Sequence, residues 1–269
     1  MIFVAMRYKI ILSYMGTNYS GWQKQPGEKT VQQTLEEAFS TILREPIEIV
    51  GCGRTDTGVH ARGYTAHFDA NNIADFFKTA YQVNAILPAD IAVWSILPVQ
   101  NDFHARYDAV ERSYAYSIHF LKDPFVYNKS FYLNAYQELN QVAMKEAAAL
   151  IMNFEYFLPF CKTGGDNKNY QCFIKNSEWY FQEYACSYTI SANRFLRGMV
   201  RLIVGACLNV GFGRLSVDTL HSCLIMQKPL PQQWSVPPQG LCFSYVVYPP
   251  AKQAGSWVAY PPGIGSITE

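Results

Sequence analysis

Hydrophobic and polar residues alternate near the start of the chain with the two-residue period of a β-strand. The alternation ends at Gly16, so it predicts a strand that runs into a turn. The hydrophobic members are Tyr8, Ile10, Leu12 and Tyr14.

A helical period follows this strand. Thr30, with Gln33 three residues later, is typical of a helix N-terminus, where the hydroxyl accepts a hydrogen bond from a free backbone N–H. The hydrophobic face that follows consists of Val31, Leu35, Ala38, Phe39 and Ile42. We therefore predict a helix that begins directly after Thr30.

Segments with the two-residue period of strands and segments with the period of helices also alternate along the rest of the chain. They predict strands at residues 47–50, 65–68, 91–97, 112–120, 179–189 and 241–248, and helices at 76–87, 142–152 and 195–210. Strands and helices occur in both halves, which favours an α+β fold with two sheet-and-helix halves.

The domain organisation is predicted from a change in the pattern near the middle of the chain. Residues 121–128, which contain Lys122-Asp123-Pro124, are read as a hinge between the halves. We predict an N-terminal half at 1–120, a C-terminal half at 121–250 and a Pro/Gly-rich tail at 251–269.

Composition narrows the class of protein. The chain has 269 residues, of which 49% are hydrophobic and only 16% charged, so it can form a substantial core. The net charge of +1 gives no reason by itself to infer a nucleic-acid partner. Seven cysteines without a CxxC pair fit reduced thiols, and no segment has the roughly 18 apolar residues needed to span a bilayer. We expect a soluble, cytoplasmic protein.

One glycine-rich segment carries the strongest chemical signal. Residues 51–63 (GCGRTDTGVHARG) place four glycines around Asp56, with Arg54 and Arg62 on either side. Glycines allow the close approach of a ligand, but Asp-Thr-Gly is also typical of a turn in which the side chain bonds its own backbone. The triplet also occurs in aspartic proteases, which need two carboxylates that share a proton. Arg54, two residues away, would instead keep Asp56 ionised.

The longer stretch from Gly53 to Ala61 (GRTDTGVHA) resembles the catalytic motif of the TruA family of tRNA pseudouridine synthases. Three other segments resemble signatures of this family in the right order. They are residues 14–25 (YMGTNYSGWQKQ) with 30–32 (TVQ), residues 103–106 (FHAR) with 112–116 (RSYAY), and residues 195–201 (FLRGMVR) with 203–205 (IVG). The resemblance covers about Arg7 to Pro249.

The resemblance implies a fold and a reaction. The fold would have a central, mainly antiparallel sheet with a cleft between the halves. The reaction would convert uridine to pseudouridine at positions 38 to 40 of the tRNA anticodon stem-loop. The target nucleotide must be flipped out of its stack, which costs a few kcal/mol. Asp56 would be the essential carboxylate, either adding covalently or helping to form a glycal.

The resemblance also assigns roles to other residues. Arg201 would be the positive partner that keeps Asp56 ionised in a closed pocket. Tyr114 would stack on the flipped uracil near C5, although an aromatic residue in an alternating strand is more often part of a core. Arg54 would fill the vacated stack or hold a phosphate.

Three further residues are candidates for contacts with the RNA backbone, although solvated loop residues would give the same pattern: Lys24, His60 and Arg62. His60, His67 and Cys52 do not have the spacing of a zinc site, and no nucleotide-binding or other cofactor motif is present. We therefore expect neither a metal nor a cofactor. The family resemblance implies a homodimer, and a tRNA partner that meets a basic cleft completed by both subunits.

Two positions depart from the family pattern. Met15 stands where an Asp is usual, and Gly198 stands where a larger polar residue is common. The lost carboxylate leaves one alternative open, a tRNA-binding relative without catalytic activity. Because the motif around Asp56 is intact, we expect an active enzyme.

Overall fold

The computed structural model describes residues 6–134, 139–162 and 169–252, so most of the predicted tail lies outside the described residues. The strands are β1 (Met6–Tyr14), β2 (Val50–Gly51), β3 (His60–Ala70), β4 (Ile91–Pro98), β5 (Glu111–His119), β6 (Phe131–Tyr132), β7 (Ile174–Phe181), β8 (Ala185–Ala192) and β9 (Leu241–Val247). The α-helices are α1 (Val31–Leu43), α2 (Phe76–Ile86), α3 (Gln141–Ile151), α4 (Met199–Gly211) and α5 (Val217–Met226).

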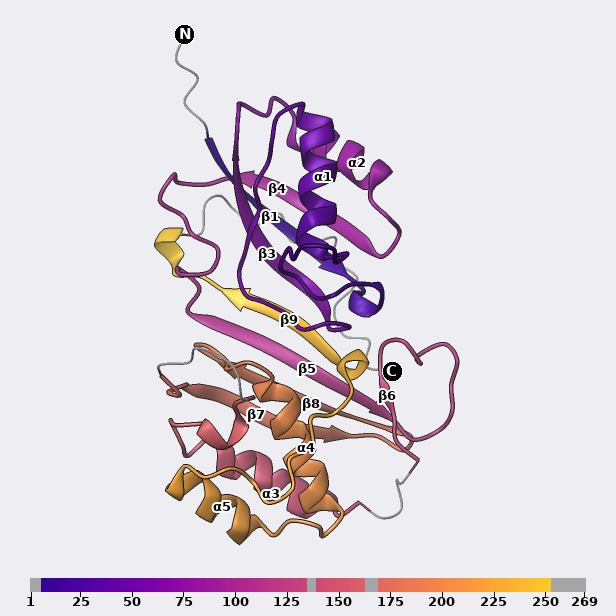
Figure 1. Ribbon diagram of the computed structural model, residues 1–269, viewed down its shortest axis with the longest axis vertical. Helices are drawn as coiled ribbons and strands as arrows, with labels where there is room; N and C mark the ends of the chain where they lie inside the picture. Colours follow the sequence, from indigo (N-terminus) through magenta and orange to yellow (C-terminus); the bar gives the residue numbers. More distant parts are fainter. Residues whose placement is uncertain (1–5, 135–138, 163–168, 253–269) are drawn as a thin grey trace.

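These strands form one sheet that runs the length of the molecule (Figure 1). The main order is β4-β1-β3-β9-β5-β8-β7, with β2 paired to β3 and β6 paired to β5. Neighbours are antiparallel except in the β3–β9 and β5–β6 pairs. Helices α1 and α2 lie at the β4-β1-β3 end, and α3, α4 and α5 lie at the β8-β7 end. The predicted α+β class with a mainly antiparallel sheet is confirmed.

The local signals of α1 act as expected. The hydroxyl of Thr30 accepts a hydrogen bond from the N–H of Gln33 at 3.4 Å, which caps the first turn. Val31, Leu35 and Phe39 are buried on the face that meets the sheet, where the Phe39 and Phe68 rings are 4.9 Å apart. The capped hydrophobic stripe therefore fixes both the start of the helix and the face that it buries.

The structure differs from the sequence predictions in several elements. Of the strand predicted at 47–50, only Val50 lies in a strand, β2, and the short strand β6 was not predicted. The single strand predicted at 179–189 is a hairpin, because β7 and β8 pair on either side of a turn at residues 182–184. The helix predicted to begin at Phe195 begins at Met199, since Gly198 has a φ of +70° and interrupts the helical backbone. Helix α5, which Ser216 caps, was not predicted.

Two hydrophobic clusters correspond to the two ends of the sheet. One contains β1, β3, β4 and α1 residues such as Tyr8, Leu35 and Phe68, and the other contains β5, β8 and α4 residues such as Tyr116 and Tyr188. Strand β9 comes from the C-terminal half but pairs with β3. The loop at residues 121–128 leaves β5 and returns to it, because β6 pairs with β5 in parallel. The two halves thus share a continuous sheet, and the division at 120/121 stays a prediction.

Gly205 illustrates how tightly α4 is packed. A Cβ at this position would overlap the carbonyl oxygen of Trp234, whereas a Cβ at Gly53 would meet only Arg112 Nε at 3.8 Å. We expect Gly205→Ala to lower the free energy of unfolding by about 1–3 kcal/mol, because the chain at Trp234 must move. The matched Gly53→Ala should change it by less than about 1 kcal/mol, with a stabilising sign. Urea denaturation of both variants checks this, and equal effects would contradict it.

Buried His67 predicts a pH dependence of stability. Its Nδ1 accepts a hydrogen bond from the N–H of Ala105 at 3.1 Å, and its side chain is 4% exposed. Burial lowers the pKa of His67 to about 4, with a smaller contribution from the positive charge of Arg7. The unfolded chain has the ordinary His pKa of about 6.5, so between these values it binds a proton that the folded protein does not. Stability is therefore complete above about pH 6.5 and falls by about 3 kcal/mol towards pH 4.

The contribution of His67 can be isolated with His67→Asn, whose side-chain oxygen can accept the same hydrogen bond but does not titrate. Urea denaturation at pH 7 and pH 4.5 should show a smaller loss of stability for the variant than for the parent. Titrating groups that do not interact with His67 contribute equally in both proteins. An unchanged difference between the two pH values would contradict the assignment.

Candidate active site

The segment that resembles a catalytic motif forms a loop, residues 52–59, that connects β2 to β3. The pairs Val50↔His67 and Gly51↔Ala66 hold its first end to the sheet. Near its other end, the N–H of Val59 donates to the carbonyl oxygen of Asp56 at 3.1 Å and closes a turn. Asp56 therefore lies on a short turn attached to a rigid sheet.

A second segment, residues 14–25, covers this loop. The N–H of Trp22 donates to Thr55 O at 3.2 Å, and the N–H of Gly58 donates to Tyr19 O at 3.3 Å. Gly21 has a φ of +86°, and a Cβ there would overlap the Thr55 carbonyl oxygen, so the two backbones can approach only at a glycine. Two of the four signatures thus form one packed unit.

Buried side chains complete the support of the loop. The hydroxyls of Tyr14 and Thr55 are hydrogen-bonded at 2.8 Å, and the Tyr64 hydroxyl donates to the carbonyl oxygen of Gly53. Arg112 donates from Nε to Cys52 O at 3.0 Å and from Nη1 to Asn193 O at 2.8 Å. Sequence reasoning did not assign this role to Arg112, although the residue begins the second part of the third signature, residues 112–116.

His60 is placed inside this unit. It is 4% exposed, its Nδ1 accepts from the N–H of Gly16 at 2.9 Å, and its Nε2 lies 3.1 Å from Gln239 O. With Nδ1 as the acceptor, Nε2 carries the proton that is donated to Gln239. Burial is the main cause that lowers the pKa of His60, so the ring is neutral at pH 7. This geometry fits a positioning role better than the phosphate contact expected from the sequence.

Asp56 is paired across the molecule with Arg201. Their atoms Oδ2 and Nη1 are 3.6 Å apart, and the side chains are 35% and 13% exposed. Arg201 lies in the first turn of α4, and its Nε donates to Val236 O at 2.6 Å. The Asp56 carboxylate is therefore open to a substrate, while the Arg201 guanidinium is held in place by its bond to Val236.

Tyr114 lies on β5, close enough to Asp56 for the carboxylate charge to affect it. Its ring meets the rings of Phe195 and Phe243 edge-on, each at 5.2 Å. Burial raises the pKa of the phenol above its ordinary value, and Asp56 raises it further. Tyr114 thus stays protonated at neutral pH, and it can offer a ring and a hydroxyl donor rather than a phenolate.

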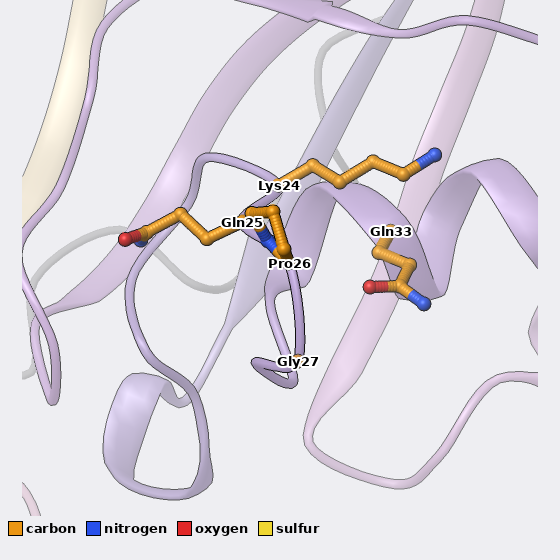
Figure 2. Close-up of a pocket in the computed structure, with 5 residues that line it drawn as sticks. All are labelled: Lys24, Gln25, Pro26, Gly27 and Gln33. Atoms are coloured by element: carbon orange, nitrogen blue, oxygen red, sulfur yellow. The ribbon is translucent and has the colours of Figure 1, made fainter.

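The other residues predicted to contact RNA are exposed, unlike His60. Arg54 and Arg62 are exposed on the loop and on β3, and Lys24 is exposed but ion-paired with Glu36 at 3.2 Å. A hollow of about 300 Å³ lies beside Lys24 and includes Gly27 and Gln33, the latter on α1 (Figure 2). It contains neither Asp56 nor Arg201.

Two further arginines, Arg194 and Arg197, lie before the first residue of α4 and so are not on the same helix as Arg201. The residue between them and the helix, Gly198, adopts the left-handed conformation that glycine favours, which explains how this chain accommodates its departure from the family pattern. Met15 stands at the N-cap of the 3-10 helix Gly16–Asn18 and makes no side-chain cap.

The described residues were also compared with the patterns of metal sites, membrane-spanning helices and disulfides. In the described part of the chain, no group of three or more His, Cys, Asp or Glu side chains is arranged to hold a metal ion. No described helix is both long and apolar enough to cross a membrane. None of the seven cysteines, all of which lie in the described ranges, forms a disulfide.

The α+β fold and the pairing of Asp56 with Arg201 are consistent with an RNA-modifying isomerase, and comparison with known proteins identifies the family. A family model described as tRNA pseudouridine synthase matches residues 10–108 and 153–249. Proteins named tRNA pseudouridine synthase A from Parabacteroides distasonis and Porphyromonas gingivalis are 42% and 41% identical over 244 and 247 residues. These matches cover 90% of this chain and 96% and 97% of the relatives.

A more distant relative of the same name, from Gloeobacter violaceus, is 36% identical over 245 residues, which cover 90% of this chain and 80% of the relative. The chain belongs to the tRNA pseudouridine synthase family, a family of isomerases. The resemblance found from the sequence motifs is confirmed.

Proposed function

We propose that this protein isomerises uridine to pseudouridine in the anticodon stem-loop of tRNA, at positions 38 to 40, with Asp56 as the essential carboxylate. The observation that carries the proposal is the 3.6 Å ion pair between Arg201 and Asp56, which lies on a loop whose sequence resembles the family's catalytic motif. Membership of the family supports the substrate class.

The reaction breaks the bond between N1 and C1′, turns the base and forms a bond between C5 and C1′. The target uridine must leave its stack, and Arg54, which is exposed two residues before Asp56, would fill the gap or hold a phosphate. Arg201 places a positive charge beside the Asp56 carboxylate, and the Tyr114 ring supports the uracil. C5 finally loses its proton to solvent and N1 takes one up, so that the product is an isomer of the substrate.

Two routes use the same carboxylate, and an isotope experiment separates them. If Asp56 helps to remove the proton at C2′ so that a glycal forms, uridine deuterated at C2′ should react more slowly. If Asp56 instead adds at C1′, no C–H bond at C2′ breaks, and the deuterated substrate should react at the ordinary rate.

The test of the proposed function is tritium release from tRNA transcripts labelled at uridine C5. Transcripts with a single uridine at position 38, 39 or 40 should each release tritium, and a transcript without uridine at these positions should not. Binding of tRNA without release would instead favour the catalytically inactive relative.

We also propose that the protein acts in the cytoplasm as a homodimer, in which both subunits contribute to the tRNA-binding surface. A second subunit would bring together the exposed cations that a chain of net charge +1 distributes sparsely. Sedimentation at working concentration should give twice the mass of one chain. A monomer that is fully active would contradict the proposal.

A further inference from the structure

The loop between β5 and β6 combines exposed aromatic and basic residues near the candidate active site. We call residues Leu121–Lys129 the aromatic loop. It leaves the end of β5 and returns beside it, because Ile118 and His119 pair with Phe131 and Tyr132. Figure 1 shows the loop extending beyond the end of strand β5. The pairing of β5 with β6 therefore anchors both ends of an extended loop.

The loop has an ordered backbone. Asp123 accepts from the N–H of Phe125 at 2.8 Å, and the N–H of Lys129 donates to Val126 O at 2.8 Å. These bonds place Tyr127 near the tip of a turn. The side chain of Asp123 is therefore engaged within the loop rather than directed at a partner.

Its aromatic side chains are unusually exposed. Phe125 is 89% and Tyr127 is 66% exposed, and within the described ranges neither ring has an aromatic partner. Lys122 and Lys129 are exposed too and form no ion pair with any described residue. Two exposed rings flanked by two lysines suit a single-stranded nucleic acid, since bases stack on the rings and phosphates meet the cations.

The base of the loop contacts residues next to the supports of both Asp56 and Arg201. On one side, the Asn128 carbonyl and the Lys129 charge both act on His60, at the start of the strand that follows the Asp56 loop. On the other side, the Phe131 ring meets the Trp234 ring edge-on at 6.2 Å. Trp234 lies two residues before Val236, whose carbonyl oxygen accepts from Arg201.

We propose that the aromatic loop binds the unpaired nucleotides next to the target uridine, with Phe125 and Tyr127 stacked on bases and Lys122 and Lys129 near phosphates. This inference rests on the proposed function, because it places the same RNA on a second surface. A second copy of the chain is the weaker occupant, since lysine is depleted in subunit interfaces and the loop presents two.

The experiment compares the parent with Phe125→Ser/Tyr127→Ser. A matched control is Phe77→Ser/Tyr81→Ser, which removes two aromatic residues of similar exposure, 85% and 70%, from α2 at the far end of the sheet. A rescue variant, Phe125→Trp/Tyr127→Trp, keeps the stacking surface. Two RNA probes are used, an anticodon stem-loop hairpin and a blunt duplex of the same stem without the loop.

For the hairpin, we expect the loop variant to raise Kd and KM by about 10-fold or more, while kcat changes less. Duplex binding should change by less than about twofold, because paired bases do not reach the rings. The control and the rescue variant should bind the hairpin like the parent. A merely structural role of the loop would weaken both probes alike.

Two results would overturn the inference. One is an unchanged hairpin Kd in the loop variant. The other is a loop variant that sediments as a smaller species than the parent, which would make this surface a subunit contact. Failure of the proposed function would appear separately, as a parent that releases no tritium, whereas the hairpin and duplex comparison reports on the loop alone.

Discussion

Asp56→Asn is expected to lower the rate of tritium release at saturating tRNA by at least about 10⁴-fold, because an amide can neither add to C1′ nor accept a proton. The substitution keeps the shape of the side chain. Backbone bonds from Trp22 and Val59 hold the loop, so its conformation does not depend on the carboxylate. The free energy of unfolding should therefore change by less than about 1 kcal/mol, and the Kd for tRNA by only about twofold.

Asp56→Glu is the matched control for charge. It keeps the carboxylate but moves it by one methylene, so it should also lose most activity through misplacement of the reacting oxygen. If Asp56→Asn retains more than about one hundredth of the parent rate, Asp56 is not the group that reacts, and the proposed function loses its central residue.

The fold could be predicted wherever a local signal and tertiary packing agree. The strand that ends at Tyr14 and the helix capped by Thr30 follow from periodicity and from one hydroxyl. The hairpin of β7 and β8 could not be found this way, because its turn at residues 182–184 contains neither glycine nor proline. The start of α4 was misplaced because Gly198 interrupts a continuous hydrophobic pattern through its backbone angle alone.

The candidate site likewise has some features that the sequence reveals and others that it does not. The motif around Asp56 is contiguous, so the sequence could single it out. Arg201 is far away in the chain, and only the family resemblance suggested the pairing that the structure places at 3.6 Å. The support from Arg112 was not predicted, since hydrogen bonds from a side chain to distant backbone carbonyls leave no pattern in the sequence. His60 was read as exposed because a loop motif does not reveal burial.

Arg201→Met is expected to lower kcat by about 10²- to 10³-fold, because the Asp56 carboxylate loses the charge that faces it in a partly buried site. The Kd for tRNA should rise much less, since Arg201 is 13% exposed and has little surface to offer a phosphate. Measured separately, kcat should therefore fall strongly while the Kd for tRNA changes little. A rise in Kd with kcat unchanged would show that Arg201 binds RNA instead of supporting Asp56.

Arg201→Lys separates charge from geometry. Lysine restores a positive charge near Asp56, but its single ammonium cannot keep both the contact with the carboxylate and the bond that Arg201 Nε donates to Val236 O at 2.6 Å. We expect kcat between those of Arg201→Met and the parent, and a free energy of unfolding lowered by about 1–3 kcal/mol in both variants, because the buried Val236 carbonyl loses its partner. Urea denaturation and single-turnover kinetics on the same samples measure the two effects. If the lysine variant is as inactive as the methionine variant, the bond to Val236 that positions the guanidinium, and not its charge, is what Asp56 requires.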